Sequence, residues 1–96
     1  MCGAVAGGLP VGVDAGKEAV IQGVVRREGV PVVGYVRLLD GTGEFTAEVP
    51  TSATGEFRFF AAPGTWTVRA LVPGGTADLT VNAAIGEISQ VEVSVS

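Results

Sequence analysis

Few side chains in this 96-residue chain could carry out chemistry. Histidine is absent, which excludes Ser–His and Cys–His nucleophile pairs and removes the most common metal-binding side chain. Acid–base catalysis would then need paired carboxylates, and Glu44 and Glu48 are an even number of residues apart in an alternating segment. Strand positions four apart are separated by about 13 Å, too far to share a proton. We interpret this pair as part of a solvated outer face, and we expect no catalytic residue and no enzymatic activity.

The loop Asp40–Glu44 (DGTGE) combines two carboxylates with two glycines. Calcium loops concentrate oxygen ligands at alternate positions over about a dozen residues, and a phosphate-binding glycine loop is followed by a helix. Neither condition is met, because only two carboxylates are present and the next residues alternate as a strand does. We expect an ordinary turn, with no bound metal and no cofactor.

Cys2 is the only cysteine, so no disulfide can form within the chain. Removal of the initiator methionine would leave its thiol next to a free α-amino group, accessible to oxidation or to sulfur transfer. Two interpretations stay open: a sulfur-accepting thiol and an ordinary tail cysteine. The lack of disulfides is compatible with the cytoplasm, where we expect the protein.

Alternating apolar residues indicate that strands carry these groups. Phe57 and Phe59 share one face of an extended segment, and Trp66 and Val68 share a face after the Pro63-Gly64 corner. The same period of two recurs about every ten residues between turn signals, and no segment shows a helical period. The seven predicted strands are Glu18–Arg26, Gly34–Asp40, Glu44–Val49, Glu56–Ala61, Thr65–Leu71, Thr76–Asn82 and Glu87–Val95.

This pattern predicts an all-β fold, an antiparallel seven-stranded Greek-key sandwich. Tyr35 and Phe60 are the aromatic residues expected to point outward, and Gly23 should mark a bulge or a close approach of two backbones. The residues expected to face inward include Phe45, Ala47, Val49, Phe57, Phe59, Trp66 and Val68.

Length and composition fit one domain. We expect residues 1–16 to be a flexible, Gly-rich N-terminal lead and residues 17–96 to form a single β-sandwich. The net charge is -4 and the six basic residues are scattered, so nucleic acid is not an expected partner. No apolar run approaches the roughly 20 residues that span a bilayer, and we expect a soluble protein without membrane contact.

The segment Thr51–Ala70 resembles the prealbumin-like sandwich of carboxypeptidase regulatory domains and collagen-adhesin repeats, a scaffold used mostly for binding. The resemblance to adhesin repeats raises the question of an isopeptide bond between a lysine and an asparagine. This chain has one of each, Lys17 and Asn82. Lys17 precedes the first predicted strand and no buried acid is expected near either residue, so we do not expect the bond.

Nearly the whole chain resembles one uncharacterised actinobacterial family whose members are often labelled SseC-like. The most distinctive matches are Met1-Cys2 and Phe59–Gly64 (FFAAPG). The other matching segments are Lys17–Ile21, Val36–Asp40, Glu44–Val49 and Ser52–Leu71. This resemblance implies a link to sulfur metabolism, because the genes of that family lie beside thiosulfate sulfurtransferases, and it implies no catalytic residue.

Three functions follow as hypotheses. The first is a non-enzymatic accessory protein of sulfur metabolism that binds a thiosulfate sulfurtransferase or another protein. The second is a sulfur carrier in which Cys2 accepts a persulfide sulfur. The third is a module that binds a carbohydrate or peptide on the loops or edge of the sandwich. Exposed aromatic residues would favour it, and only Tyr35 and Phe60 are predicted to point outward. In each case, the valine-rich last strand could also pair with a second copy through the sheet edge.

Overall fold

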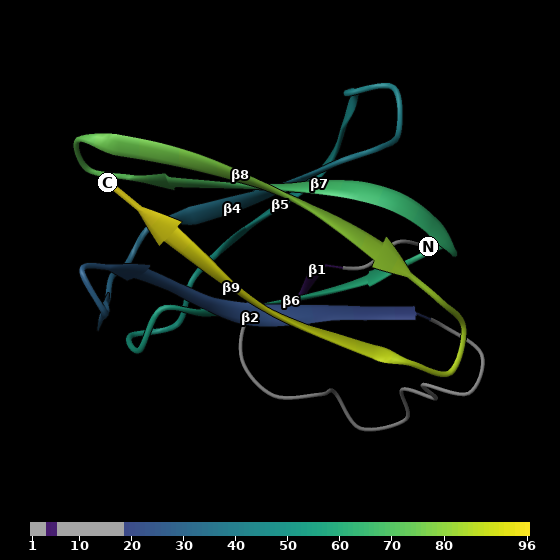
Figure 1. The fold of residues 1–96 in the computed structure, drawn as a ribbon, viewed down its shortest axis with the longest axis horizontal. Coiled ribbons are helices and arrows are strands. Elements are labelled where there is room, and N and C mark those ends of the chain that lie inside the picture. Colours follow the sequence, from purple (N-terminus) through teal and green to yellow (C-terminus); the bar gives the residue numbers. More distant parts are fainter. Residues whose placement is uncertain (1–3, 6–18) are drawn as a thin grey trace.

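Two β-sheets packed face to face form the structure, a computed structural model that describes residues 4–5 and 19–96 (Figure 1). The first sheet contains β1 (Ala4–Val5), β2 (Ala19–Arg27), β3 (Val30–Pro31), β6 (Glu56–Ala61) and β9 (Ile88–Val95). The second contains β4 (Tyr35–Leu39), β5 (Phe45–Pro50), β7 (Gly64–Val72) and β8 (Gly75–Ala83). The described residues include no helix that could cross a membrane. The predicted all-β sandwich is confirmed.

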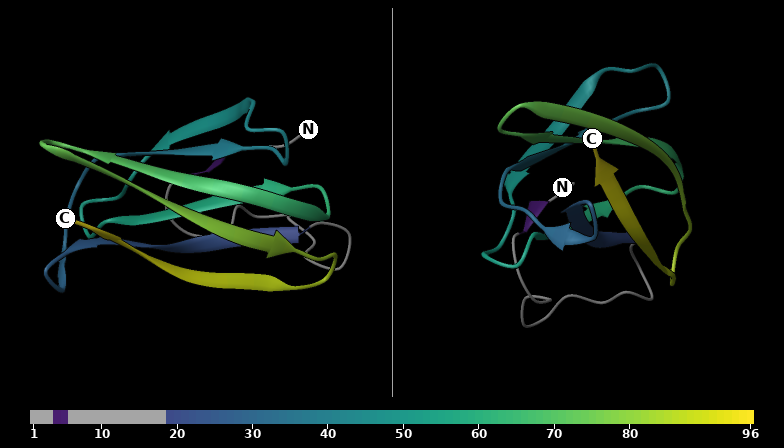
Figure 2. Two further views of the ribbon diagram at one scale, coloured as in Figure 1. Left: turned by 45° about the horizontal axis from the view of Figure 1, so that its top comes forward. Right: turned by 60° about the vertical axis from the view of Figure 1, so that its left-hand side comes forward.

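The chain passes back and forth between the two layers, as the turned views in Figure 2 show. It builds β2 and β3 in the first sheet, β4 and β5 in the second, β6 in the first, β7 and β8 in the second, and β9 in the first. The strand order of the second sheet is β5-β4-β7-β8, with every pair antiparallel. In the first sheet β2 is central, between β9 on one side and β6 with β3 on the other, and β1 lies beyond β6.

One pair differs from the predicted antiparallel arrangement, because β9 runs parallel to β2 from Val20↔Ile88 to Arg27↔Val95. The loop before β9 lies beside the start of β2, where the amide of Val20 donates to the carbonyl of Glu87 at 3.1 Å. Strand β9, which follows this loop, therefore runs in the same direction as β2. Alternation in a sequence shows which face a residue occupies and carries no information on strand direction.

All seven predicted strands are present, with ends that agree within one residue. The structure adds the two-residue strands β1 and β3. β1 falls within the predicted lead of residues 1–16, and it pairs with β6 through Ala4↔Phe59 and Val5↔Arg58. The rest of that lead lies outside the described residues.

The core lies between the sheets and contains the aromatic residues predicted for it. Phe57, Phe59, Trp66 and Val68 are at most 9% exposed. The rings of Phe57 and Phe59 are 6.1 Å apart between centroids and tilted by 57°, within the separation at which aromatic pairs attract each other. The Trp66 indole N–H donates to the carbonyl of Ala62 at 2.9 Å, so its one polar atom is satisfied. These four side chains join aliphatic residues from both sheets in one cluster.

The prediction that Phe45 faces inward with Ala47 and Val49 is wrong, since Phe45 is 61% exposed. The register of β4 and β5 shifts between Leu38 and Leu39, so Leu38 pairs with Ala47 but Leu39 pairs with Phe45. A bulge adds one residue to a strand and reverses the side on which later side chains lie. Phe45 therefore shares the outer face of the second sheet with Leu39.

The prediction that Phe60 is exposed is also wrong, although its side chain does point to the outer face of its sheet as predicted. Phe60 points away from the Phe57 and Phe59 side of β6, lies opposite Val20 in register, and is only 4% exposed. Gly23 behaves as predicted, because a Cβ there would lie 2.0 Å from the carbonyl oxygen of Val91. The backbones of β2 and β9 approach each other at this glycine.

Candidate functional site

The outer face of the second sheet carries a row of four charged side chains, one on each strand. Val36 and Leu38 enter the core, so Arg37 between them points outward. Its cross-strand neighbours are Glu48 on β5 and Arg69 on β7, and Arg69 in turn lies opposite Asp78 on β8. We call the row Glu48, Arg37, Arg69 and Asp78 the charge ladder.

Each arginine of the charge ladder is bound to the carboxylate on its outer side. Arg37 Nε donates to Glu48 Oε1 at 2.6 Å. Arg69 forms a two-pronged pair with Asp78, from Nε to Oδ1 at 2.8 Å and from Nη2 to Oδ2 at 3.0 Å. This hydrogen bonding lowers the pKa of Asp78 and raises that of Arg69 from their ordinary values. The ladder thus carries no net charge, although its centre is cationic.

Two exposed aromatic side chains lie on the same face, one on each side of the charge ladder. Tyr35 is 54% exposed and sits in register with Pro50 and Leu71. Phe45 is 61% exposed, and the guanidinium carbon of Arg37 lies 5.9 Å from its ring centroid. We call the charge ladder with Tyr35 and Phe45 the ladder face. Tyrosine, phenylalanine and arginine are the residue types enriched where proteins bind one another.

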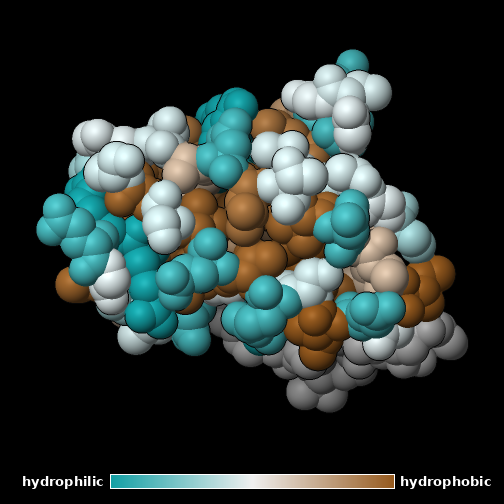
Figure 3. Space-filling model, viewed as in Figure 1, coloured by the Kyte–Doolittle hydropathy of each residue, from teal (hydrophilic) through white to brown (hydrophobic). Residues whose placement is uncertain are grey.

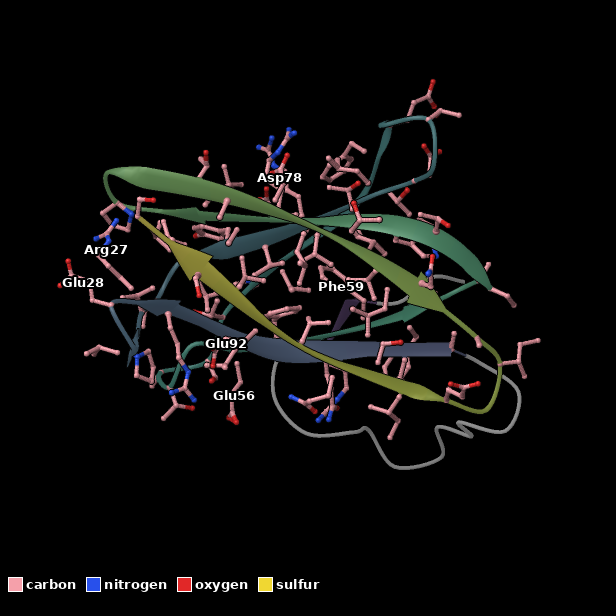
Figure 4. All side chains as sticks on the ribbon, viewed as in Figure 1. Arg27, Glu28, Glu56, Phe59, Asp78 and Glu92 are labelled. Carbon is pink, nitrogen blue, oxygen red and sulfur yellow. The ribbon has the colours of Figure 1, made fainter. Side chains whose placement is uncertain are left out.

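The outer face of the first sheet holds a hollow of about 470 Å³. The residues that line it are Gln22, Gly23, Val24, Arg26, Pro31, Thr54, Glu56, Phe57, Arg58 and Gln90. Figure 4 shows the contrast between the two sides of this sheet, because Phe59 points between the layers whereas Glu56 and Glu92 point away from them. The hollow and the ladder face therefore lie on opposite sides of the molecule.

A chain of hydrogen bonds crosses one side of the hollow. Arg58, Gln22 and Gln90 are in register on β6, β2 and β9. Arg58 Nε donates to Gln22 Oε1 at 2.7 Å, and Gln22 Nε2 donates to Gln90 Oε1 at 2.7 Å. On the other side Arg26 Nε lies 3.1 Å from Glu92 Oε2, close enough for an ion pair but outside hydrogen-bonding geometry.

A third surface feature is the open edge between the layers. Within the described chain β8 pairs only with β7, and β9 pairs only with β2. The partly buried Ala77, Leu79 and Val91 lie on these two strands. Figure 3, viewed as Figure 1, shows hydrophobic surface in the region between β8 and β9, with hydrophilic side chains around it. The predicted pairing with a second copy would use this edge, and it stays a prediction.

The acidic residues that the sequence raised as candidates are all at the surface. Glu44 and Glu48 are exposed, as predicted, and Glu48 belongs to the charge ladder. The Asp40 loop is the expected turn: Asp40 Oδ1 accepts hydrogen bonds from the hydroxyl and the amide of Thr42 and from the amide of Glu44. These bonds, the Thr42 hydroxyl first, lower the pKa of Asp40. No group of three acidic or cysteine side chains suited to a metal ion occurs among the described residues.

Cys2 and Lys17 lie outside the described residues. Asn82, the other half of the lysine–asparagine pair, is exposed on β8 and its Oδ1 accepts a hydrogen bond from the Thr65 hydroxyl at 3.0 Å. The absence of an isopeptide bond stays a prediction. The sequence does not reveal the ladder face, because alternation places Phe45 in the core and the position of Arg37 opposite Arg69 depends on strand register.

The fold and these surfaces define a small two-layer β-sandwich with polar and aromatic outer faces. A family model described as a protein of unknown function, DUF1416, matches residues 2–95, and the chain belongs to this family. An uncharacterised protein of Mycolicibacterium smegmatis is 58% identical over 90 residues, which are 92% of this chain and all of that protein. Two uncharacterised proteins of Mycobacterium tuberculosis, Rv0814c and Rv3118, are each 53% identical over 90 residues, covering 92% of this chain and 90% of each relative.

Among solved structures, a DUF3823 family protein from Parabacteroides merdae is similar with a TM-score of 0.63 at 16% sequence identity. The match covers 83% of this chain but only 46% of that protein, so the chain spans about half the length of this structural neighbour. At this identity the likeness concerns the fold alone, and it agrees with the β-sandwich described above.

Proposed function

We propose that the protein is a non-enzymatic binding protein of the cytoplasm that recognises another protein through the ladder face. The observation that carries the proposal is the exposure of Tyr35 and Phe45 on either side of two arginines on one sheet face. A few residues carry most of the binding energy at protein interfaces, and tryptophan, tyrosine and arginine are enriched among them. The arginines are already held by Glu48 and Asp78, so they have little side-chain freedom left to lose on binding.

The partner we propose is a thiosulfate sulfurtransferase. Its support is the resemblance of Met1-Cys2 and Phe59–Gly64 to the SseC-like family and the association of that family with sulfur metabolism. The partner would contact the ladder face, and this protein would position or regulate the enzyme without reacting itself.

Calorimetry of the protein with a thiosulfate sulfurtransferase tests this proposal. Tyr35→Ala and Phe45→Ala should each weaken the complex by about 2 kcal/mol, a loss of roughly thirtyfold in affinity. Val30→Ala and Ile85→Ala are matched controls, since both residues are exposed and apolar but lie outside the ladder face. Absence of a complex together with unchanged enzyme turnover would refute the sulfurtransferase partner. Equal binding by all four variants would refute the proposal that the ladder face is the binding surface.

The sulfur-carrier alternative rests on Cys2, the only thiol of the chain. In that reaction the Cys2 thiolate attacks the outer sulfur of a cysteine persulfide on the sulfurtransferase. The S–S bond of the enzyme breaks, its thiolate is regenerated, and Cys2 holds the persulfide. Mass spectrometry after incubation with the charged enzyme should then show one added sulfur on the wild type and none on Cys2→Ser. An unmodified wild type would remove this alternative.

A carbohydrate ligand is favoured less by the geometry than a protein. Sugars bind by stacking on open aromatic rings, but the Arg37 guanidinium lies near the ring of Phe45, and Phe60 is buried. Of the two aromatic residues predicted to point outward, only Tyr35 is exposed.

A further inference from the structure

The two edge strands of the second sheet differ in how well they are protected against pairing with another chain. Proline, charge and irregular pairing protect a sheet edge. β5 ends at Pro50, carries Glu48 and pairs with β4 through a register shift. β8 is nine residues long, contains neither proline nor lysine, and pairs with β7 without a shift. Its one charged side chain, Asp78, is bound to Arg69 of the neighbouring strand, so β8 is the unprotected edge.

The turn between β7 and β8 determines which backbone groups of β8 point to the free edge. The two strands are joined by Pro73-Gly74, so the flanking Val72 and Gly75 form a hydrogen-bonded pair. Such pairs alternate with non-hydrogen-bonded pairs along an antiparallel ladder. The even-numbered residues of β8 therefore direct their N–H and C=O groups away from β7.

Strand β9 approaches this edge at both ends and leaves its middle open. At one end the Asn82 carbonyl accepts a hydrogen bond from Ser89 Oγ at 2.9 Å, which agrees with the alternation. At the other end a Cβ on Gly75 would lie 2.8 Å from Cγ1 of Val95. Between these points, no strand of the described chain pairs with the backbone of residues Thr76–Thr80 on this side.

The inner side of the open edge is apolar. Ala77 and Leu79 on β8 and Val91 on β9 are only partly buried, and Figure 3 shows hydrophobic surface in the region between the two strands. Another strand placed against β8 would pair its backbone groups and cover this apolar surface.

We propose that β8 pairs antiparallel with β8 of a second copy, with Leu79 on the two-fold axis. Leu79 is the middle residue of β8 (Gly75–Ala83), so this register pairs the strand with itself over its whole length. Leu79 then meets its own copy on the apolar side, and Asp78 lies opposite the neutral Thr80 of the second copy. A pairing centred on Asp78 would instead place two carboxylates directly opposite each other, which destabilises a sheet.

The alternation along β8 favours a second copy as the occupant. A strand that fits must present polar residues on the outer side and apolar residues on the inner side in the same register. β8 meets this condition, with Thr76, Asp78 and Thr80 outside and Ala77 and Leu79 inside. Opposed residues of an antiparallel pair point to the same side, so the ladder faces of both copies would lie on one continuous surface. The dimer needs no sulfurtransferase, and the inference is therefore independent of the proposed partner.

Sedimentation velocity of the full chain over a series of concentrations tests the pairing. A single strand pair buries less surface than a standard interface, so we expect a dimer with a dissociation constant in the micromolar range. In the isotope-labelled protein, nuclear magnetic resonance should show concentration-dependent shifts of the backbone amides of Thr76, Asp78 and Thr80. The amides of β5 should not shift.

Thr80→Pro removes an amide that points away from β7, so it breaks no hydrogen bond between β7 and β8. It should weaken the dimer about tenfold or more, because the second copy loses a donor and meets the proline ring. Thr80→Ala is the matched control, since it keeps the amide and should dimerise as the wild type does. If Thr80→Pro does not fold, the amide shifts of the wild type still decide between β8 and β5.

Three results would overturn the proposal. The first is a monomer at every concentration, which would leave the edge to a strand of another protein. The second is a dimer that folded Thr80→Pro forms as well as the wild type. The third is a set of concentration-dependent shifts that lie on β5 instead of β8.

Discussion

Arg37 and Arg69 lie directly opposite each other on the neighbouring strands β4 and β7. Like charges at opposed positions destabilise a sheet, but here each guanidinium is bound to a carboxylate on the side away from the other arginine. Glu48 holds Arg37 and Asp78 holds Arg69. The end carboxylates of the charge ladder thus allow two arginines to occupy the middle of an exposed sheet face.

Asp78→Asn should reduce the loss of stability in acid. The hydrogen bonds from Arg69 lower the folded-state pKa of Asp78 below its ordinary value of 3.8. The resulting stabilisation is present above that value, and it is lost as the pH falls through the lowered folded-state pKa. The two side chains are 40% and 48% exposed, so solvent screening keeps this contribution small.

Urea unfolding of wild type and Asp78→Asn at about pH 7 and about pH 3 measures this effect, and the difference between the proteins should shrink at the lower pH. Some acid sensitivity should remain in the variant, because the pKa of Asp40 is also lowered. An equal difference at both pH values would contradict the role assigned to Asp78.

Removal of both end carboxylates should cost more than the sum of the two single changes. In Glu48→Gln with Asp78→Asn neither arginine has its partner, and the repulsion between Arg37 and Arg69 is no longer offset. We expect a coupling free energy of up to about 1 kcal/mol from a double-mutant cycle at low salt. Added salt should reduce the coupling by screening. Additive single effects at low salt would show that the two ion pairs are independent.

Alternation alone predicted most of the fold. It located all seven longer strands and the inward positions of Phe57, Phe59, Trp66 and Val68, because a period of two decides which side chains reach the core. It could not show that one inserted residue between Ala47 and Phe45 reverses the face of Phe45. Bulges depend on the pairing of two strands, and a single strand carries no sign of them.

The candidate sites were less predictable than the fold, because each depends on register between distant strands. The position of Arg37 between the apolar Val36 and Leu38 indicates an outer face, but its neighbours Glu48 and Arg69 follow from the alignment of β5, β4 and β7. The hollow depends on β9 lying parallel to β2, which places Gln90 beside Gln22. Side-chain type and spacing along one strand do not determine such contacts.

Gly23→Ala should be strongly destabilising, although alanine normally suits a strand better than glycine does. The new Cβ would lie 2.0 Å from the carbonyl oxygen of Val91, a backbone atom that cannot move without disturbing the pairing of β2 and β9. We expect a loss of about 3 kcal/mol in the free energy of unfolding.

Gly41→Ala is the matched control, because the nearest atom to a Cβ at that position is a carbonyl oxygen 3.7 Å away. Thermal unfolding of the two variants should show a large decrease for Gly23→Ala and little change for Gly41→Ala. A Gly23→Ala protein as stable as wild type would mean that β9 can shift away from β2 at little cost.

Phe59→Ala and Phe45→Ala should separate stability from binding. Phe59 is fully buried, and its truncation should cost about 4 kcal/mol through lost contacts and the cavity left behind. Phe45 is 61% exposed, so its truncation should change the free energy of unfolding by less than about 0.5 kcal/mol. Urea unfolding measures both values, and calorimetry with the sulfurtransferase should then show the loss of binding in a Phe45→Ala protein that remains folded. A Phe45→Ala protein destabilised as much as Phe59→Ala would return Phe45 to the core, where simple alternation had placed it, and would remove it from the ladder face.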